Sequence, residues 1–494
     1  MNSIITFSDV SFEFPNGHRL FTHISFSIEP KLTALVGPNG IGKTCLANLI
    51  TGALTPTQGS IQKKETLTFF PQRQIPEPIP VDQFLSLDYT WSALSEKLLD
   101  GIDGQTLCSQ LSGGQWMRVR LSKILDEQFL VLDEPTNDLD REGRQILLQF
   151  LKQRHTGALL ISHDRECLEL CEEVFELSSH GLTKFGGSWR LYEDAKKNER
   201  AALGVNLKLA KRERDQAFIN QVNEKNRQDK KNRRGTQQAM KGGLPRILIG
   251  GRKRRAQNTT GKIAITTLKQ TIIAVQSAHQ AFEELKTDPI MYANLIVKEI
   301  PNQKLVAEAI AFNVRLQEWL FKNDLNFSWR GNVRIALKGA NGSGKTTLLN
   351  AVLGHQHEIR GELRRGNLAT CYIDQQCSLL DDSKSIFDNI RDISIAHESE
   401  IRNNLAKFLF TKETVFQKVS SLSGGERLRA SLAKGLLQAE QPEFLILDEP
   451  TNNLDLGNIE FLENLVREFK GALIITSHDE VFLKNCNMTE ELEI

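Results

Sequence analysis

The chain has 494 residues, a formal net charge of +1, 40% hydrophobic residues and 25% charged residues. This ordinary composition excludes wholesale disorder, and the length exceeds the ~250 to 300 residues at which one hydrophobic core stops growing, so we expect two large domains and a connector. The start carries no basic stretch followed by a long apolar run, and no apolar run reaches ~18 residues. These patterns predict a cytoplasmic protein with no membrane span.

The first part of the chain has the pattern of an α/β domain. "LTALVG" is a short apolar run that enters "GPNGIGKT" at 37–44, and the helix-like "TCLANLITG" follows. "FLVLDE" and "ALLISHD" are apolar throughout instead of alternating, which is typical of buried parallel strands. We therefore expect a parallel sheet with a Gly-rich loop at the start of a helix.

The Gly-rich loop and the strand ends predict nucleotide chemistry. In G-x-x-x-x-G-K-T, backbone N–H groups cradle phosphates, Lys43 reaches the β and γ phosphates, and Thr44 offers a hydroxyl to Mg²⁺. Asp133 ends an apolar strand and suits a hold on Mg²⁺. Glu134 follows it at once, where a carboxylate is the natural general base for an attacking water.

The middle of the chain predicts a helical hairpin. Residues 196–234 contain no proline and one glycine, so a helix of nearly 40 residues, ~60 Å long, is expected. On the return, an apolar stripe recurs at helical spacing; its members are Leu268, Ile272, Val275, Phe282 and Leu285. We expect it to face Leu203, Leu207, Ala210 and Phe218. Beyond Val222 no large apolar residue follows until Met240, so the far half must lie in solvent or against something charged.

This middle segment is strongly basic. Residues 196–262 hold 20 Lys or Arg against 5 Asp or Glu, which indicates a polyanion partner. No aromatic residue lies between Phe218 and Phe282, which favours phosphate contacts over base stacking. The candidate RNA-binding residues are Lys230, Lys231, Arg233, Arg234, Arg252, Lys253, Arg254 and Arg255. A solvated loop or a localisation signal is the alternative for the last four, and the neighbouring "PRILIGG" either caps the hairpin end or enters an RNA cavity.

The last part of the chain repeats the first. "GANGSGKT" at 339–346, "YIDQ", "LSGGE", "LILDEPTNNLD" and "TSHD" follow their counterparts in the same order, at offsets that drift from 302 to 315 residues. Lys345, Thr346, Asp448 and Glu449 thus take the roles of the earlier four residues. The chain therefore holds two copies of one α/β domain.

Each copy also contains a second anion receptor. Ser112, Gly113 and Gly114 open one helix, as Ser423, Gly424 and Gly425 open another, and each turn presents a hydroxyl and bare amides at a helix N-terminus. A single domain would have two phosphate receptors for one nucleotide. The economical arrangement places the serine–glycine turn of one domain across the nucleotide held by the other, so that ATP joins the domains.

These motifs, together with "GGSWRLYEDAKKNER" at 186–200, resemble the ABC-F family, whose members are tandem ATP-binding cassettes without transmembrane domains. The resemblance covers essentially the whole chain. It implies two P-loop ATPase domains, 1–193 and 306–494, joined by a helical-hairpin linker, 194–305. It further implies hydrolysis of ATP to ADP and phosphate with Mg²⁺, in a monomer whose cassettes close on two ATP. The implied partner is the ribosome, with the linker contacting rRNA or tRNA near the exit site and the peptidyl-transferase centre. The implied role is that of a translation factor or of an antibiotic-resistance protein that protects the ribosome.

The resemblance also completes the set of site residues. It implies that Gln72 and Gln375 sense Mg²⁺ and water, that His163 and His478 contact the γ-phosphate, and that Phe14 stacks on adenine, with Phe312 as the second-site candidate. The ATP-binding residues are Gly37, Pro38, Asn39, Gly40, Ile41, Gly42, Lys43, Thr44, Gly339, Ala340, Asn341, Gly342, Ser343, Gly344, Lys345, Thr346, Phe14 and the two serine–glycine turns. The metal ligands are Thr44, Asp133, Thr346 and Asp448. No role is assigned to Trp116.

Two alternative functions fit part of the pattern. A transporter motor that docks on separate membrane subunits explains the cassettes but leaves the basic hairpin without a purpose. A DNA-maintenance ATPase fits the charge. However, relatives of excision-repair ATPases carry zinc-binding cysteine pairs, and the seven cysteines here include no Cys-x-x-Cys pair.

Overall fold

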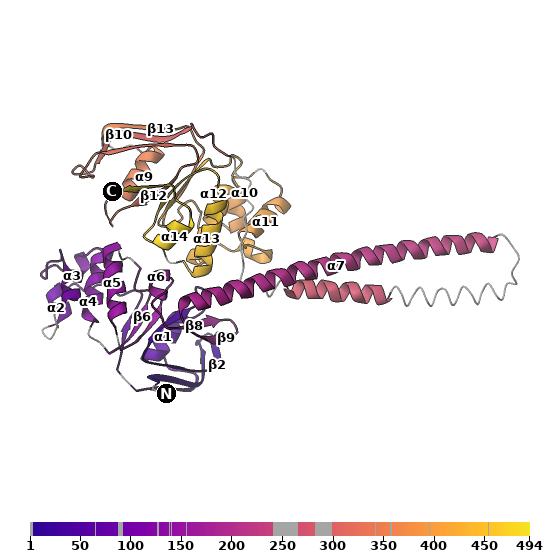
Figure 1. The fold of residues 1–494 in the computed structure, drawn as a ribbon, viewed down its shortest axis with the longest axis horizontal. Helices are drawn as coiled ribbons and strands as arrows, with labels where there is room; N and C mark the ends of the chain where they lie inside the picture. The colour runs from indigo at the N-terminus through magenta and orange to yellow at the C-terminus, as the bar shows by residue number, and fades with distance from the viewer. Residues whose placement is uncertain are drawn as a thin grey trace. The chain divides into compact units, whose positions relative to one another are not determined.

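The computed structural model describes residues 3–64, 66–86, 92–125, 128–137, 139, 141–154, 156–240, 265–281, 299–340, 342–355, 358–394, 396–452 and 454–494. The chain forms two compact units (Figure 1). One unit combines Met1–Tyr192, the first cassette, with Met291–Ile494, the second cassette. The other unit, Glu193–Ile290, is the linker unit. The predicted domain boundaries at 193 and 305 stay predictions.

A mainly parallel sheet forms the centre of the first cassette. Its strand order is β5-β6-β7-β3-β8-β9, and only β9 runs antiparallel to its neighbour. The strands are β3 (Leu32–Val36), β5 (Leu67–Phe70), β6 (Phe129–Asp133), β7 (Ala158–Ile161), β8 (Glu173–Ser178) and β9 (Gly181–Gly186). Because β6, β7 and β3 are neighbours, the residues that follow them meet at one edge of the sheet.

The second cassette repeats this arrangement with five parallel strands in the order β14-β15-β16-β12-β17. These are β12 (Arg334–Lys338), β14 (Thr370–Ile373), β15 (Phe444–Asp448), β16 (Ala472–Thr476) and β17 (Glu490–Glu493). The predicted strands of both copies are therefore confirmed. β3, β6, β7, β15 and β16 are buried along their whole length, which explains why their sequences are apolar without alternation.

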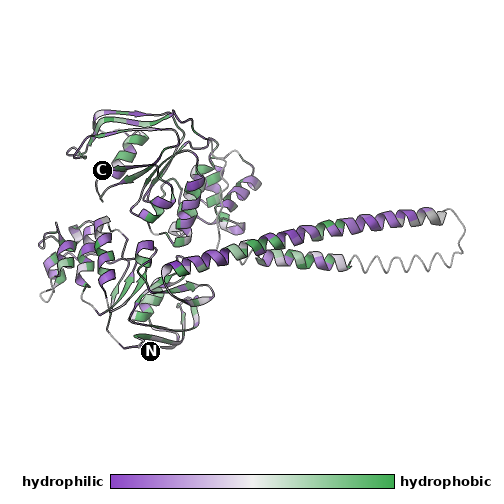
Figure 2. Ribbon diagram, viewed as in Figure 1, coloured by the Kyte–Doolittle hydropathy of each residue, from purple (hydrophilic) through white to green (hydrophobic). Residues whose placement is uncertain are grey.

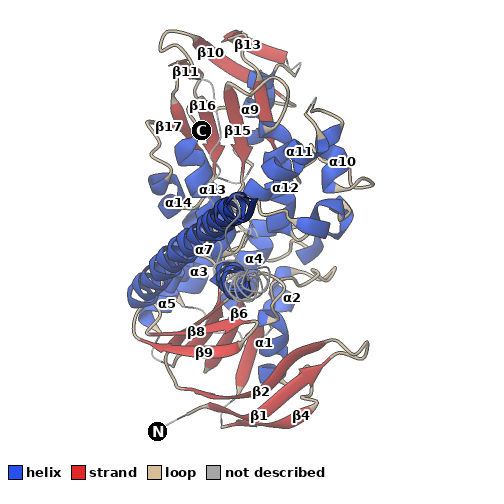
Figure 3. Cartoon of the chain, turned by 90° about the vertical axis from the view of Figure 1, so that its right-hand side faces the viewer, coloured by secondary structure: helices blue, strands red, loops and turns tan. Residues whose placement is uncertain are grey.

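Each cassette adds an antiparallel three-stranded sheet and a set of helices (Figure 3). The sheets are β2 (Arg19–Ile28), β1 (Ile5–Glu13) and β4 (Gln58–Lys63), and β11 (Leu325–Arg330), β10 (Leu305–Arg315) and β13 (Glu358–Arg365). First-cassette helices are α1 (Lys43–Thr51), α2 (Val81–Leu85), α3 (Ala93–Leu99), α4 (Gly113–Lys123), α5 (Arg141–Gln153) and α6 (Arg165–Leu168). Those of the second are α9 (Lys345–Leu353), α10 (Ile386–Arg391), α11 (Glu398–Lys407), α12 (Gly424–Leu436), α13 (Leu456–Glu468) and α14 (Glu480–Asn485).

The linker unit contains most of α7 (Trp189–Met240), from Glu193 onward, and a second helix over 265–281. α7 has 52 residues, longer than the predicted helix, and spans ~78 Å at 1.5 Å per residue. It begins inside the first cassette, where Trp189 belongs to the core. Figure 2 shows that the half of α7 toward Met240 is almost continuously hydrophilic.

The predicted apolar seam of the hairpin is wrong. Leu268, Ile272 and Val275 remain 49%, 47% and 41% exposed, whereas Thr271 and Ala278 of the same helix are 5% and 7% exposed. Small side chains allow two helix backbones to approach closely, so they form the contact in place of the larger residues. The hydroxyl of Thr271 donates to Gln221 Oε1 over 3.4 Å, which ties this helix to α7.

On α7 the expected contacts are confirmed in part. Leu207 and Ala210 are 8% and 7% exposed, but Phe218 is 46% exposed. Phe282 and Leu285 lie outside the described residues, as does the basic run 252–255. No helix among the residues that the structure describes is long and apolar enough to cross a membrane. All seven cysteines are free thiols.

Two glycines of the first Gly-rich loop give a matched test of its packing. Gly42 has φ +107°, and a Cβ there would lie 2.6 Å from Leu20 Cδ2, whereas Gly40 has φ +79° and open space around it. Gly42→Ala adds a steric clash to the cost of the left-handed backbone, while Gly40→Ala has only the backbone cost of about 1–2 kcal/mol. We expect thermal unfolding to show a clearly lower Tm for Gly42→Ala. Equal Tm values for the two variants would contradict this packing.

Candidate nucleotide sites

Each Gly-rich loop wraps around its lysine at the carboxyl edge of the parallel sheet. Lys43 Nζ donates to the carbonyls of Gly37 and Pro38 over 2.7 and 3.2 Å. Lys345 makes the same two bonds to the first two residues of its own loop, at 2.8 and 3.2 Å. Burial lowers the pKa of Lys43. A desolvated ammonium inside a ring of backbone dipoles is well placed for the charge of a phosphate.

A hydroxyl and a carboxylate form an oxygen pair beside each lysine. Thr44 Oγ1 donates to Asp133 Oδ2 over 2.8 Å, and Thr346 Oγ1 donates to Asp448 Oδ2 over 2.9 Å. Asp133 is 1% exposed, and burial raises its pKa. A buried carboxylate next to a hydroxyl supplies the hard oxygen ligands that Mg²⁺ prefers, so both pairs fit this ion.

The two candidate general bases share an unusual backbone. Glu134 and Glu449 have φ values of +50° and +47°, in the left-handed region that non-glycine residues seldom adopt. Such strain costs of order 1–3 kcal/mol and is concentrated at functional sites. The carboxyl oxygens of Glu449 are buried and accept no hydrogen bond from the residues that the structure describes. Buried acceptors without a donor indicate a place for a water or a ligand.

A histidine faces each of these glutamates. His163 Nε2 lies 3.5 Å from Glu134 Oε1, and His478 Nε2 lies 3.3 Å from Glu449 Oε1. Burial raises the pKa of Glu134 to about 8 and that of Glu449 to about 7, and burial lowers the pKa of His163. A carboxyl with a pKa near neutrality is tuned for taking up a proton from water.

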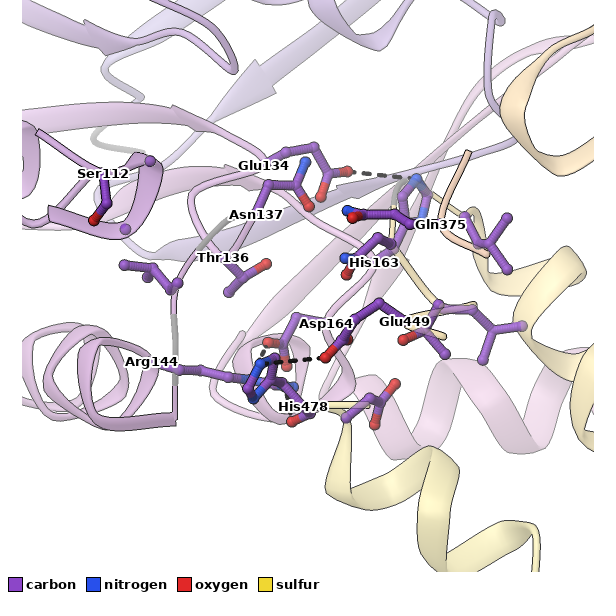
Figure 4. Close-up of a pocket in the computed structure, with 18 of the residues that line it drawn as sticks. Ser112, Glu134, Thr136, Asn137, Arg144, His163, Asp164, Gln375, Glu449 and His478 are labelled. Carbon is purple, nitrogen blue, oxygen red and sulfur yellow. Dashed lines mark hydrogen bonds and ion pairs between the residues drawn. The ribbon is translucent and has the colours of Figure 1, made fainter. Parts of the chain in front are cut away.

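One cavity of about 500 Å³ is lined by residues of both cassettes (Figure 4). The first cassette contributes Ser112, Gly113, Gly114, Glu134 and His163, and the second contributes Gly342, Gln375, Glu449 and His478. The structure thus brings the serine–glycine turn of the first cassette to the Gly-rich loop of the second. This is the crossed arrangement expected from the two anion receptors.

At the other Gly-rich loop, the cassettes also touch. The backbone N–H of Asn39 donates to Asp455 Oδ2 over 3.0 Å. Asp455 is the N-cap of α13 and closes the "DEPTNNLD" segment of the second cassette. Gln72 is half-buried just after β5, and Asn341 lies outside the described residues.

Both serines of the serine–glycine turns cap the helices that follow them. Ser112 accepts from the backbone of Gln115 over 3.3 Å, and Gln115 Oε1 accepts from the backbone of Ser112 over 3.0 Å. Ser423 and Glu426 form the same reciprocal pair in α12. These capping boxes hold the helix N-termini, and with them the glycine amides, in a defined orientation.

Sequence reasoning missed a contact that links α4 to the segment after Gln72. Trp116 Nε1 donates to the carbonyl of Gln74 over 2.9 Å, and Arg120 Nε donates to Gln74 Oε1 over 3.1 Å. The Arg120 guanidinium also lies 4.1 Å from the ring centre of Phe70. The position of Trp116 directly after the turn was the available signal, but its partner is 42 residues away in the sequence.

The aromatic candidates for adenine differ between the cassettes. Phe14 is half-buried at the end of β1, beside the His18 ring. Phe312 is 0% exposed in the core, so its assignment as a second-site adenine contact is wrong. Trp319, in the loop between β10 and β11, is 40% exposed and has the Arg360 guanidinium 4.8 Å from its ring centre.

The fold, the paired Gly-rich loops and the Ser112 turn at the Gly342 loop define a tandem P-loop ATPase. A family model described as ABC transporter matches residues 21–137 and 322–452, half of the chain. The ATP-binding protein Uup of Haemophilus influenzae is 30% identical and covers 98% of this chain and 76% of its own length. The ribosome protection protein VmlR of Bacillus subtilis is 29% identical over 98% of this chain and 85% of its own. ABC transporter F family member 5 of Arabidopsis thaliana is 26% identical, and the match covers 91% of this chain and 69% of that protein. This chain therefore belongs to the ABC-F family of ATPases.

Solved structures share the fold. The archaeal ribosome recycling factor aABCE1, in its complex with the ribosomal stalk protein aP1, matches with a TM-score of 0.62 over 98% of this chain and 87% of its own, at 16% identity. The RNase-L inhibitor matches with a TM-score of 0.59 over 97% of this chain and 86% of its own, at 15% identity. Two tandem ATP-binding cassettes are therefore the architecture of this protein.

The raised pKa of Glu449 predicts a pH-dependent stability. The folded-state pKa of about 7 exceeds the ordinary 4.5, so the stabilisation is complete below pH 4.5 and is lost as the pH rises through 7. Glu449→Gln stays neutral and avoids this loss, which is at most ~3 kcal/mol at 1.36 kcal/mol per pKa unit. In nucleotide-free protein with EDTA, we expect the Tm gain of the variant to be larger at pH 8 than at pH 5.

Glu440→Gln is the matched control, because Glu440 is an exposed carboxyl of the same cassette. It should leave Tm unchanged at both pH values. A Tm gain for Glu449→Gln that does not depend on pH would contradict the assignment of a neutral buried carboxyl.

Proposed function

We propose that this protein acts on the ribosome, with ATP closing its two cassettes and the linker unit contacting rRNA or tRNA near the exit site and the peptidyl-transferase centre. It is proposed to do so as a cytoplasmic monomer, as a translation factor or as a protein that protects the ribosome from an antibiotic. The observation that carries this proposal is the exposed positive charge on the far half of α7.

Positive charge exceeds negative charge over the far half of α7. Lys230, Lys231, Arg233 and Arg234 are all exposed, and no large apolar residue follows Val222 before the end of the helix. A helix of this kind has no apolar face to bury against a protein core, whereas phosphates offer it many ion contacts. Arg252, Lys253, Arg254 and Arg255 extend the charge along the sequence. The names of two similar proteins, a ribosome protection protein and a ribosome recycling factor, support the same partner.

In the proposed reaction, water displaces ADP from the γ-phosphate of ATP. Mg²⁺, when bound to the Thr44–Asp133 and Thr346–Asp448 pairs, neutralises phosphate charge. Lys43 and Lys345 bind the β and γ phosphates, and the glycine amides of the opposite cassette's turn bind the γ-phosphate from the other side. Glu134 and Glu449 take up the proton of the attacking water, while Gln72, Gln375, His163 and His478 orient water and phosphate.

Adenine is proposed to stack on Phe14 at the first site and on Trp319 at the second. Trp319 is exposed, and the guanidinium groups of Arg315 and Arg360 lie 5.9 and 4.8 Å from its ring centre. These guanidinium groups help to hold the indole in one orientation, and they place positive charge near an anionic ligand.

Removing both general bases tests the ribosomal role. Glu134→Gln together with Glu449→Gln is expected to bind ATP without hydrolysing it and to keep the cassettes closed on the ribosome. Sedimentation of ribosomes through a sucrose cushion should then carry the double variant into the pellet in the presence of ATP, and translation should be inhibited. If this variant stays in the supernatant, the ribosomal proposal fails and a transporter or DNA-maintenance role becomes the better explanation.

Neutralising the far half of α7 tests the RNA contact. Replacing Lys230, Lys231, Arg233 and Arg234 with Gln removes four potential phosphate contacts, and each lost contact reduces the salt dependence of log K by roughly 0.7–0.9. We expect weaker pelleting and a shallower dependence on KCl concentration.

The control removes the same charge from the surface of the second cassette, through Gln at the exposed residues Arg391, Arg402, Lys412 and Lys418. It should retain more binding and a steeper salt dependence than the α7 variant. Equal loss in both variants would mean that ribosome association depends on overall charge and not on α7.

A further inference from the structure

An arginine of the first cassette holds the backbone of a site residue in the second. Arg144, on α5, donates from its NH1 group to the carbonyl oxygen of His478 over 2.6 Å. Figure 4 shows Arg144 and His478 side by side at the cavity that both cassettes line. His478 belongs to the "TSHD" segment after β16, so this bond joins two parts of the chain that are 334 residues apart.

The side chain of Arg144 is itself held firmly. It is 10% exposed, and its Nε lies 2.6 Å from Asp164 Oδ2 and 3.8 Å from Glu166 Oε2. Burial opposes the positive charge, but the neighbouring Asp164 carboxylate outweighs burial and raises the pKa of Arg144. Asp479 adds a further carboxylate near this guanidinium. A buried cation between fixed carboxylates cannot reorient freely, so the His478 carbonyl that it binds is fixed as well.

The position of that carbonyl bears on the second nucleotide site. The imidazole of the same residue lies 3.3 Å from Glu449 Oε1 and 3.4 Å from Lys345 Nζ. A displacement of the backbone by a fraction of an ångström changes both distances at once, because the ring is attached two bonds from the backbone. The bond from Arg144 therefore reaches the groups that are proposed to act on the γ-phosphate.

The repeated half of the chain cannot form the same bond at the first site. The residue 315 positions after Arg144 is Ile459, whose side chain has no donor. A second contact between the cassettes also has no counterpart in the repeat. Arg165 NH1 lies 2.5 Å from Glu463 Oε1. The position that corresponds to Arg165 holds Glu480, and the one that corresponds to Glu463 holds Leu148. Both of these arginine contacts therefore run from the first cassette to the second.

We propose that Arg144 is a positioning residue that acts across the cassette boundary, holding the His478 backbone so that His478 and Glu449 are aligned for hydrolysis at the second nucleotide site alone. The two sites of this protein are then inequivalent, and the second depends on a side chain that the first lacks. This inference rests on the proposed role of His478 at the γ-phosphate.

Steady-state ATP hydrolysis by the full chain with Mg²⁺ is the primary measurement. Arg144→Gln leaves a neutral donor of shorter reach. When Glu134→Gln is also present, so that only the second site hydrolyses, we expect Arg144→Gln to lower kcat about tenfold with KM changed less than about twofold, since misalignment of catalytic groups affects the transition state more than binding. Arg144→Lys retains the charge beside Asp164 and should recover part of kcat. An unchanged kcat for Arg144→Gln would overturn the proposal.

Double-mutant cycles separate positioning from a structural role. If Arg144 acts through His478, then Arg144→Gln costs little more once His478→Ala is present, whereas it keeps its full effect on top of His163→Ala. Full additivity with His478→Ala, or loss of the effect in the His163→Ala background, overturns the positioning role and leaves the proposed function intact. If His478→Ala alone leaves kcat unchanged, the proposed role of His478 fails and the inference fails with it.

A matched control and a folding check complete the test. Arg190→Gln removes an arginine of the same cassette whose ion pair with Glu169 is exposed, and kcat should be unchanged. Thermal unfolding shows whether Arg144→Gln is folded. If it is not, the same cycles are run with Arg144→Lys, where a kcat equal to that of the unsubstituted protein overturns the proposal.

Discussion

The desolvation of charge at the carboxyl edge of the parallel sheets is the constraint on which this structure depends. Lys43 follows β3, and Asp133 and Glu134 lie at the end of β6, on the other side of β7, and all three side chains are almost buried. Buried charges are costly unless they are paired, so the loop carbonyls and the Thr44 hydroxyl compensate them in part. The charge that remains uncompensated suits a phosphate and a cation. The left-handed backbone at Glu134 is part of the same strained arrangement.

Because the cassette is duplicated, the same cluster of buried charges occurs twice. At each Gly-rich loop, residues of the opposite cassette lie nearby. The serine–glycine turn at Ser112 lies at the cavity of the Gly342 loop, while the backbone of Asn39 contacts Asp455. A helix N-terminus held by a capping box provides oriented amides, which suit an anion shared by two cassettes. The groups proposed to bind nucleotide are therefore also groups at which the two cassettes meet. The contact from Trp116 to the Gln74 carbonyl connects such a turn with the segment after β5 of its own cassette.

The linker unit is not organised around buried charge. Its two helices bury Thr271 and Ala278 on one and Leu207 and Ala210 on the other, and leave Leu268 and Ile272 half-exposed. Along α7 no large apolar residue lies between Val222 and the terminal Met240, so the far half cannot be stabilised by a core. Exposed lysine and arginine side chains there are free to meet a polyanion, which is the feature that separates this chain from a cassette pair with a simple connector.

The sequence by itself determined the parallel strands, both Gly-rich loops, the serine–glycine turns and the acidic residues at the ends of β6 and β15, because these depend on local patterns and on backbone geometry that only certain residues allow. Repetition of the motifs in order was enough to predict two cassettes, and the two anion receptors of each cassette predicted that the Ser112 turn lies at the Gly342 loop. Only the tertiary structure decided which side chains meet across long sequence separations. In the tertiary structure Phe312 is buried, and the helix over 265–281 buries small residues in place of the predicted large ones. Trp116 donates to the carbonyl of Gln74, and Arg144 donates to the carbonyl of His478. Periodicity identifies a face of a helix but not its partner, and a buried arginine has the same sequence signal as an exposed one, so these contacts follow from packing in three dimensions alone.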